Sequence, residues 1–458
     1  MGGWLRSALF APVAVPGPRR RLGIVVAVVL SLASIPLSLL RQPGSAVDDP
    51  WAEDGTIFLG DAYAHPLRTV LLTPYAGYVA VYPRLVAAVA AHVDVARAPL
   101  LLALGGALAC AAAVGITVVG SEGHLASIGL RAVLGAAVAL YPLAGVEIAA
   151  STCNAQWYLM AAAPWALLWR PRGTAGAALA AAVLFFGASN DPLFGLLLPL
   201  AAARAVAFPR VRDNAAGIGL VAGLVGQLPS LLHPALVAPG SRPGAGALLA
   251  SWLWRGPTEA VLGARPAGVL GAGGLVAATL VLGLAVLVAG VVRGGRGRLA
   301  ALLTSTGAVL YLVPGYLRWD PRMAALRPMV FASRYGLVPS VLSLAVCVLA
   351  VDAVLSRHRR EHSPTVSGSA GRWARAAPQL AVGLLAAGLL AAAVGGRHLG
   401  YPRTPSWSAQ LPAARAACAV PGPQVAGAPA DRPVTVALTG APTAAWVTAV
   451  PCRLLAAG

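Results

Sequence analysis

Long apolar runs separated by short polar connections fill most of the chain. The first run, residues 23–40, follows three consecutive Arg residues. Further runs lie at 98–119, 129–150, 155–169, 174–189, 192–207, 214–232, 267–292, 299–317, 335–356 and 378–397. A membrane-spanning helix needs about 20 residues, so the shorter runs between 155 and 207 predict tilted, broken or re-entrant segments. The pattern predicts an all-α polytopic membrane protein with about 11 transmembrane helices.

The runs divide the chain into three parts. Residues 1–22 are a short N-terminus, 23–397 form the membrane domain, and 398–458 form a tail rich in Pro, Ala and Gly. A long connection at 42–97, the first loop, interrupts the membrane domain. Only 11% of the residues are charged and 58% are hydrophobic, whereas soluble domains carry about 25% charged residues. A soluble chain of this size would lack the polar residues to cover its surface.

The basic residues predict an orientation. All 34 are Arg, and most lie in short clusters between apolar runs, for example at 204–212 and 357–360, whereas the connection at 120–128 has none. Cytoplasmic connections are enriched in basic residues, so we expect the N-terminus in the cytoplasm and the tail outside. Arg in place of Lys, with much Ala and Gly, suggests a GC-rich bacterial genome, so the expected location is a bacterial plasma membrane. The clusters do not follow one helix face, so the net charge of +19 does not indicate nucleic-acid binding.

With this orientation, most carboxylates and two cysteines fall on the outer side. Cys418 and Cys452 lie in the tail, where an oxidising compartment favours a disulfide between them. The tail contains one strand-like stretch, Val434–Leu438. The sequence has no CxxC motif, and lone His residues such as His65 and His233 have no companions at metal-binding spacing, so no metal site is expected.

The first loop is the most informative segment. It carries the adjacent Glu53 and Asp54 among aromatic residues, and its apolar positions at 56–72 suit a helix lying in the membrane interface. One carboxylate could act as a general base at the membrane surface. Neighbours on a helix point about 100° apart, so one would face the site and the other support it. The alternative is a solvated acidic loop.

Two further segments place polar groups at the outer ends of predicted spans. One comprises Glu147 with the run Asn154–Tyr158, and the other contains Asp191 before Pro192. Polar groups at membrane depth often line a cavity. The alternatives are interhelical hydrogen bonds with an aromatic belt for the first segment, and a helix N-cap for Asp191.

The outer connection at 318–335 carries Arg318, Arg322 and Arg334 next to Tyr335. Positive charge is disfavoured on this side, so the cluster calls for an anionic partner. Guanidinium matches phosphate in bidentate fashion, which makes a phosphate the natural partner. Pairing with Asp320 or with lipid head groups is the alternative.

Three of these segments resemble the multi-spanning glycosyltransferases of the GT-C fold. The similarity is carried by Trp51–Gly55, Asn154–Trp157 and Arg334 with Tyr335. The resemblance implies a GT-C-like bundle and a polyprenyl-phosphate-linked sugar donor, with inverting transfer to a glycan or lipid of the cell envelope. The tail of about 60 residues is smaller than the outer domain of several members.

The resemblance also implies roles for individual residues. Asp54 or Glu53 would be the base, and Arg84, Arg318, Arg322 and Arg334 would stabilise the departing lipid phosphate. The sugar would contact Tyr78, Asn154, Gln156, Trp157, Asp191 and Tyr335. Membrane lipids are the other expected partner. No cofactor is implied with certainty, and a divalent cation stays open.

Two other function classes fit parts of the pattern. A transporter or flippase of lipid-linked sugars would use the same polar groups without chemistry, and would also need them on the cytoplasmic halves of the spans. A non-catalytic protein of envelope assembly would not need clustered aromatics in the first loop. Because the polar residues concentrate at the outer ends, the sequence favours an enzyme.

Overall fold

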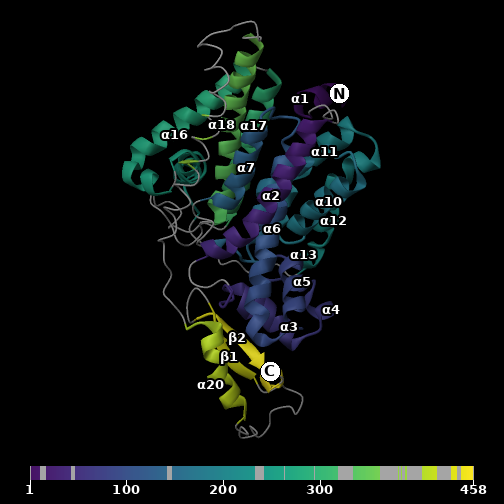
Figure 1. Ribbon diagram of the computed structural model, residues 1–458, viewed down its shortest axis with the longest axis vertical. Helices are drawn as coiled ribbons and strands as arrows, with labels where there is room; N and C mark the ends of the chain where they lie inside the picture. The colour runs from purple at the N-terminus through teal and green to yellow at the C-terminus, as the bar shows by residue number, and fades with distance from the viewer. Residues whose placement is uncertain are drawn as a thin grey trace.

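The chain folds into a helical bundle with a small mixed unit at one end, in a computed structural model (Figure 1). The structure describes residues 2–10, 17–42, 47–141, 147–232, 242–262, 264–292, 294–317, 334–361, 380, 383, 387–388, 405–419, 435–440 and 445–456. The predicted span at 378–397, and the residues Arg318 and Arg322, therefore lie wholly or almost wholly outside the described part.

Six stretches of helix are long and apolar enough to cross a membrane. They are Pro18–Arg41, Val95–Gly120, Val211–Leu232, Val269–Val291, Arg296–Leu317 and Arg334–Arg357. The helices that contain them are α2 (Pro18–Arg41), η2 (Val95–Arg97) with α6 (Ala98–Gly120), η4 (Val211–Asn214) with α12 (Ala215–Val225) and α13 (Leu228–Leu232), α16 (Ala264–Val292), α17 (Gly294–Leu317) and α18 (Arg334–Glu361). The prediction of an all-α polytopic membrane protein is thus confirmed, whereas the count of 11 spans is not.

The predicted runs between 129 and 207 form helices inside or beside this bundle. They are α7 (Ile128–Leu140), α9 (Ala155–Leu168), α10 (Thr174–Ala188), and η3 (Pro192–Leu197) with α11 (Leu198–Ala207). A further helix, α5 (Val81–Ala90), lies in the first loop, where no span was predicted. Every residue of α9 is buried, since α6, α10 and α18 pack around it. A helix enclosed by protein need not match the thickness of the bilayer by itself. This position explains how α9 can be only 14 residues long.

Between α13 and α16, a π-helical turn places a buried ion pair within the bundle. The elements here are α14 (Ala245–Leu253), η5 (Trp254–Thr258) and α15 (Glu259–Leu262). Arg255 lies 2.7 Å from Glu259, to which the Tyr141 hydroxyl also donates at 2.9 Å. Ser340 on α18 donates to the Arg255 carbonyl at 2.5 Å. These partners compensate the buried charges and fasten η5 to α7 and α18.

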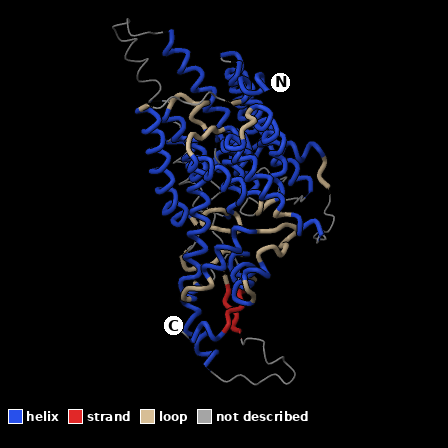
Figure 2. Tube along the Cα trace, turned by 90° about the vertical axis from the view of Figure 1, so that its right-hand side faces the viewer, coloured by secondary structure: helices blue, strands red, loops and turns tan. Residues whose placement is uncertain are grey.

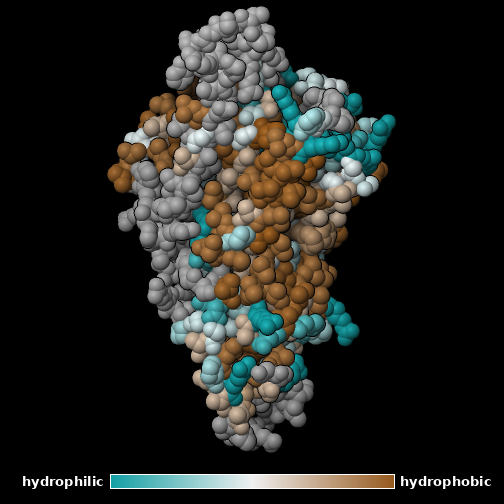
Figure 3. Space-filling model, viewed as in Figure 1, coloured by the Kyte–Doolittle hydropathy of each residue, from teal (hydrophilic) through white to brown (hydrophobic). Residues whose placement is uncertain are grey.

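The face of the bundle in Figure 3 carries a broad apolar belt with polar residues toward both ends. On α2, the exposed residues of the belt include Val25, Val29 and Leu32, and on α16 they include Leu280 and Leu284. A soluble protein rarely exposes such a large continuous patch, so the belt is the expected lipid-facing surface.

The two termini lie at opposite ends of the bundle (Figure 1). The helix α1 (Gly2–Leu9) docks at one end, where Arg6 donates to the Ala207 carbonyl. Arg296 pairs with Asp352 at 2.6 Å, and Arg20 and Arg131 approach Glu122. We call the opposite end, which carries the C-terminus, the tail end.

The two strands of the tail lie at the tail end (Figure 2). There the first loop and the tail share one hydrophobic core. The tail forms α20 (Trp407–Ala419), β1 (Thr435–Thr439), β2 (Val447–Pro451) and α21 (Cys452–Ala456). The strands pair antiparallel with Val436 opposite Val450. The Trp407 indole donates to the Val95 carbonyl at 2.8 Å. The sequence indicated β1 but not β2, and the tail is integrated into the first loop rather than appended to it.

The prediction of a single interface helix over residues 56–72 is wrong. The segment forms η1 (Asp54–Leu59), α3 (Gly60–Ala64) and α4 (Leu67–Val70). Pro66 forces its neighbour His65 into an extended conformation, with φ −138° and ψ 148°, which ends α3. The side chains of Phe58 and Tyr63 pack into the core shared with the tail, so they do not form a membrane-facing stripe.

Cys418 and Cys452 form a disulfide that links α20 to the start of α21. It closes a loop over a sequence separation of 34 residues. Such a loop corresponds to about 3–4 kcal/mol of stabilisation. We expect the double variant C418S/C452S to lose the tail to limited proteolysis much faster than the wild type does. The control is Cys347→Ser, which removes a free cysteine of α18; equal cleavage rates in the double variant and this control would contradict the assignment.

Candidate functional site

A cavity of about 170 Å³ lies between the first loop, α9, η3, α17 and α18. A water molecule needs only about 10–15 Å³ on this measure, so the cavity has room for a monosaccharide-sized molecule. Eight of the residues predicted from the sequence line it. They are Glu53, Tyr78, Asn154, Gln156, Trp157, Asp191, Arg334 and Tyr335. The rest of the described lining consists of Phe58, Tyr75, Cys153, Pro192, Leu193, Pro314 and Leu317.

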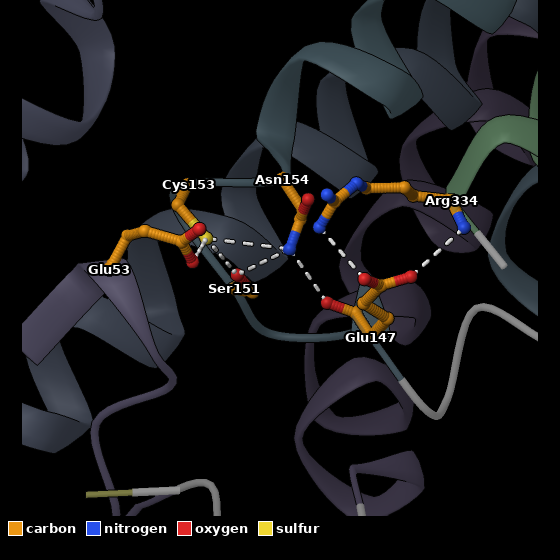
Figure 4. A network of polar contacts seen from close by, with 6 residues as sticks. All are labelled: Glu53, Glu147, Ser151, Cys153, Asn154 and Arg334. Carbon is orange, nitrogen blue, oxygen red and sulfur yellow. Dashed lines mark hydrogen bonds and ion pairs between the residues drawn. The ribbon is translucent and has the colours of Figure 1, made fainter. Parts of the chain in front are cut away.

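Arg334 is held in the cavity wall by Glu147 (Figure 4). The guanidinium Nη1 lies 2.8 Å from Glu147 Oε1, and the Arg334 backbone N–H donates to Oε2 at 3.2 Å. Glu147 is buried, and the Arg334 side chain keeps 32% of its surface exposed. The ion pair therefore fixes Arg334 at the first residue of α18 and leaves part of its guanidinium exposed at the cavity.

The segment that carries Cys153 and Asn154 is a tight, buried turn. Ala150 adopts a left-handed φ of 52°, which is unfavourable for a residue with a Cβ. Asn154 Nδ2 donates to the Glu147 carbonyl at 2.9 Å and to Ser151 Oγ at 3.3 Å. Gly106 on α6 permits the close approach, since a Cβ there would lie 2.4 Å from Ser151 N. The turn thus ties the Arg334 pair to the acidic part of the first loop.

Asp54 fastens this turn from the other side. Its Oδ2 accepts from the Thr152 N–H at 2.9 Å and from the Ser151 hydroxyl at 3.2 Å. Its Oδ1 accepts from the Cys153 N–H at 2.7 Å and from the Thr152 hydroxyl. Asp54 is buried and is not among the cavity-lining residues. The structure therefore favours a positioning role for Asp54 over the role of base.

Glu53 is the member of the acidic pair that faces the cavity. Its Oε2 lies 3.6 Å from Cys153 Sγ, and it interacts with the Tyr75 side chain. Burial raises the pKa of Tyr75 to about 12, and the Glu53 carboxylate acts in the same direction. A partly exposed carboxylate beside a protonated tyrosine in a cavity is suited to accept a proton from a bound hydroxyl.

Aromatic rings form much of the cavity wall. The rings of Trp157 on α9 and Tyr335 on α18 make an edge-to-face contact, with 5.1 Å between the ring centroids. Tyr75 and Tyr78 are presented by a tight turn in which each backbone N–H donates to the carbonyl of the other, at 2.8 and 3.1 Å. The turn needs Gly77 because its φ is 88°. Sequence analysis missed Tyr75 as a site residue, although the motif Pro-Tyr-Ala-Gly-Tyr indicates a turn that projects both tyrosines.

Asp191 combines both of the roles considered from the sequence. Its Oδ1 accepts from the Leu193 N–H at 2.9 Å and so caps η3. The residue also lines the cavity. The cap holds the carboxylate at the cavity wall, because the hydrogen bond fixes the side-chain rotamer.

Arg84 does not line the cavity, which corrects its expected role at a phosphate. Its Nη1 lies 2.7 Å from Asp61 Oδ2, and its guanidinium lies 5.5 Å from the centre of the Phe58 ring. Arg84 is a buried residue of α5, and its partners Asp61 and Phe58 lie on α3 and η1. Its charge is therefore used to hold the first loop together. The prediction overlooked that a carboxylate of the same loop, Asp61, lies within reach.

Comparison with family models, with curated proteins and with solved structures finds no match for this chain. Function is therefore argued from the site alone. Among the described residues, no group of three or more His, Cys, Asp or Glu side chains could hold a metal ion. The possibility of a divalent cation consequently receives no support from that part of the chain.

Burial of Asp54 makes the stability of the site depend on pH. Burial raises its pKa from 3.8 to about 7, against the hydrogen bonds from Thr152 and Cys153, which lower it. The folded state therefore holds this proton more tightly than the unfolded state does. The contribution of the proton to stability is fully present below about pH 4 and is lost as pH rises through about 7.

We expect the melting temperature of the detergent-solubilised protein to fall between pH 5 and pH 8. The fall should be shallower in the Asp54→Asn variant, because its amide side chain does not titrate. Parallel curves for the two proteins would show that Asp54 is ionised throughout this range.

Proposed function

We propose that this protein is a membrane glycosyltransferase that moves a sugar from a polyprenyl-phosphate donor to an acceptor of the cell envelope. The observation that carries the proposal is a single cavity, at one end of an apolar bundle, that unites Glu53, Arg334 and a wall of aromatic rings. The tail end would face outward, as the Arg distribution predicts. The GT-C resemblance of the three motifs agrees with this function, because all three motifs contribute to this cavity.

The proposed reaction assigns a role to each side of the cavity. The acceptor hydroxyl oxygen attacks the anomeric carbon and forms the new C–O bond. The bond from that carbon to the phosphate oxygen breaks, and the lipid phosphate leaves with the electron pair. Glu53 takes the hydroxyl proton, which contributes about 10²–10⁴-fold to the rate. Arg334 stabilises the negative charge that grows on the phosphate. Because Glu147 already holds the guanidinium in place, the side chain need not reorganise during the reaction.

The lipid chain would leave the cavity beside α17. Pro314 and Leu317 line the cavity at the last turns of this helix, and Leu317 is 63% exposed. An exposed apolar residue beside a cavity in a membrane bundle suits contact with an isoprenoid chain. Arg318 and Arg322 follow α17 in the sequence, so they remain predicted partners of the phosphate.

The test uses the full chain reconstituted in lipid vesicles. Citronellyl-phosphate-linked sugars, radiolabelled in the sugar, are offered with a bacterial envelope fraction as acceptor. The proposal predicts that label moves from the lipid to the envelope fraction. If the label stays on the lipid and the labelled lipid crosses the bilayer, the protein is a transporter. If the label is neither transferred nor moved across the bilayer with any of the sugars, the proposal fails.

A further inference from the structure

Three guanidinium groups gather around one buried ring at the end of the bundle opposite the tail end. The ring is that of Phe208, which packs edge to face against Phe10. The Cζ atoms of Arg170, Arg6 and Arg204 lie 4.2, 5.1 and 5.9 Å from its centroid. These three residues, the Arg cluster, belong to the connection after α9, to α1 and to α11. Like charges this close repel one another, so an anion would stabilise the cluster.

Neutral carbonyl groups hold two of the three cations in place. Arg6 donates from Nε and Nη2 to the Ala207 carbonyl, at 3.1 and 2.6 Å. Arg204 donates to the backbone carbonyls of Leu167 and, at 2.6 Å, Asp213. The carboxylate of Asp213 also attracts Arg204. The carbonyls fix the positions of the guanidinium groups but carry no net charge, so one nearby carboxylate serves three cations.

Arg170 is the member of the Arg cluster that is best placed to bind an anion from outside. Among the described residues it makes no hydrogen bond and no ion pair, and its buried Nε has no partner. Its side chain is half-buried, so part of it stays accessible. A guanidinium carries five N–H donors in a planar fork, which matches the oxygens of a phosphate.

The surface beside the Arg cluster is apolar and lies at the edge of the membrane-facing belt. Val206 and Val211, on either side of Phe208 in the sequence, are both exposed. Trp4 of α1 is exposed as well, and Arg298 lies 5.4 Å from the centre of its ring. An exposed Trp is typical of the membrane–water interface. Hydrophilic residues adjoin the apolar belt at this end (Figure 3), so the Arg cluster lies at the level of lipid head groups.

We propose that Arg6, Arg170 and Arg204 form a binding site for the phosphate of an anionic phospholipid, whose acyl chains lie against Val206 and Val211. Lipid already surrounds the protein on this side, so a head group reaches the Arg cluster more readily than a soluble anion does. Basic pockets between membrane helices bind anionic head groups in this way. The site does not depend on the proposed function, since none of these residues is in the described lining of the cavity.

Two further Arg residues favour a lipid with a net negative charge over a zwitterionic one. Arg210 and Arg212 follow Phe208 in the sequence and are exposed. Among the described residues neither forms an ion pair. A zwitterionic head group brings its own cation to this basic rim, whereas a phosphatidylglycerol head group does not.

The experiment titrates the full chain, in a detergent with a neutral head group, with three probes. They are dioctanoyl phosphatidylglycerol, dioctanoyl phosphatidylcholine and inorganic phosphate, and calorimetry gives the affinities. We expect phosphatidylglycerol to bind saturably and at least about tenfold more tightly than the other two probes. Equal binding of phosphatidylcholine, or of inorganic phosphate, would overturn the proposal of an anionic-lipid site.

The Arg170→Gln variant tests the position of the site. It should bind phosphatidylglycerol about fivefold more weakly, the loss expected for one Arg beside an anionic lipid. The matched control is Arg21→Gln, which removes an exposed Arg of α2 at the same end of the bundle and should leave the affinity unchanged. Unchanged affinity in Arg170→Gln, or an equal loss in both variants, would overturn the proposal. If Arg170→Gln does not fold, the exposed double variant R210Q/R212Q takes its place, with the same expected direction and the same control.

Discussion

Replacing Glu53 by Gln should lower sugar transfer by about 10²–10⁴-fold and leave the folded protein intact. Gln has the same shape but cannot accept the acceptor's proton at neutral pH. Glu53 is partly exposed to the cavity, and Gln can keep its contacts with Cys153 and Tyr75, so the substitution should cost little stability. The measurement is the transfer rate in vesicles, together with the melting temperature of the same preparation.

The matched control for Glu53→Gln is Asp94→Asn, which removes one negative charge from the same loop. Asp94 lies outside the cavity and caps η2 through the Ala96 N–H at 2.8 Å. The control should transfer sugar at the wild-type rate. Full activity in Glu53→Gln would show that Glu53 is not the base.

The Asp54→Asn variant should lose folding stability as well as activity, which separates the two members of the acidic pair. Each carboxylate oxygen of Asp54 accepts one backbone N–H, from Thr152 and from Cys153. In the variant, the side-chain NH₂ would meet one of these N–H groups, whichever way the amide is turned. An unsatisfied buried donor costs about 1–3 kcal/mol, and the strained turn at Ala150 loses an anchor.

Thermal unfolding and hydrogen exchange report this loss directly. We expect a lower melting temperature in Asp54→Asn than in Glu53→Gln, and faster exchange of the Thr152 and Cys153 amides. A stable Asp54→Asn protein with slow exchange at both amides and no transfer would instead return the role of base to Asp54.

The helical membrane architecture was predictable because the apolar runs determine it. The lengths of the individual helices were harder to predict. For example, α9 is shielded by protein on all sides, so its length is set by packing. The first loop was mispredicted for a related reason. The apolar residues Phe58 and Tyr63 have the spacing of an interface helix, but their partner is the tail, which lies more than 300 residues further on in the sequence.

Eight of the predicted residues line one cavity, and several of them lie at the ends of their helices. Asn154, Asp191 and Arg334 each occur where an apolar run meets a connection, and the fold brings these three positions to one cavity. Sequence alone could not show which of Glu53 and Asp54 lines the cavity, because Asp54 is turned away by its hydrogen bonds to the backbone of Thr152 and Cys153. Nor could it assign Arg84, whose role follows from its contact with Asp61.

Photo-crosslinking of a donor analogue tests the central claim most directly. A citronellyl-phosphate sugar with a diazirine on the ring is bound to the wild-type protein and activated, and the labelled peptides are identified by mass spectrometry. The account predicts labelling of the segments that contain Tyr78, Trp157 and Tyr335, suppressed by excess unlabelled analogue. Labelling confined to other segments, such as α14–α16, or labelling that the unlabelled analogue does not suppress, would contradict it.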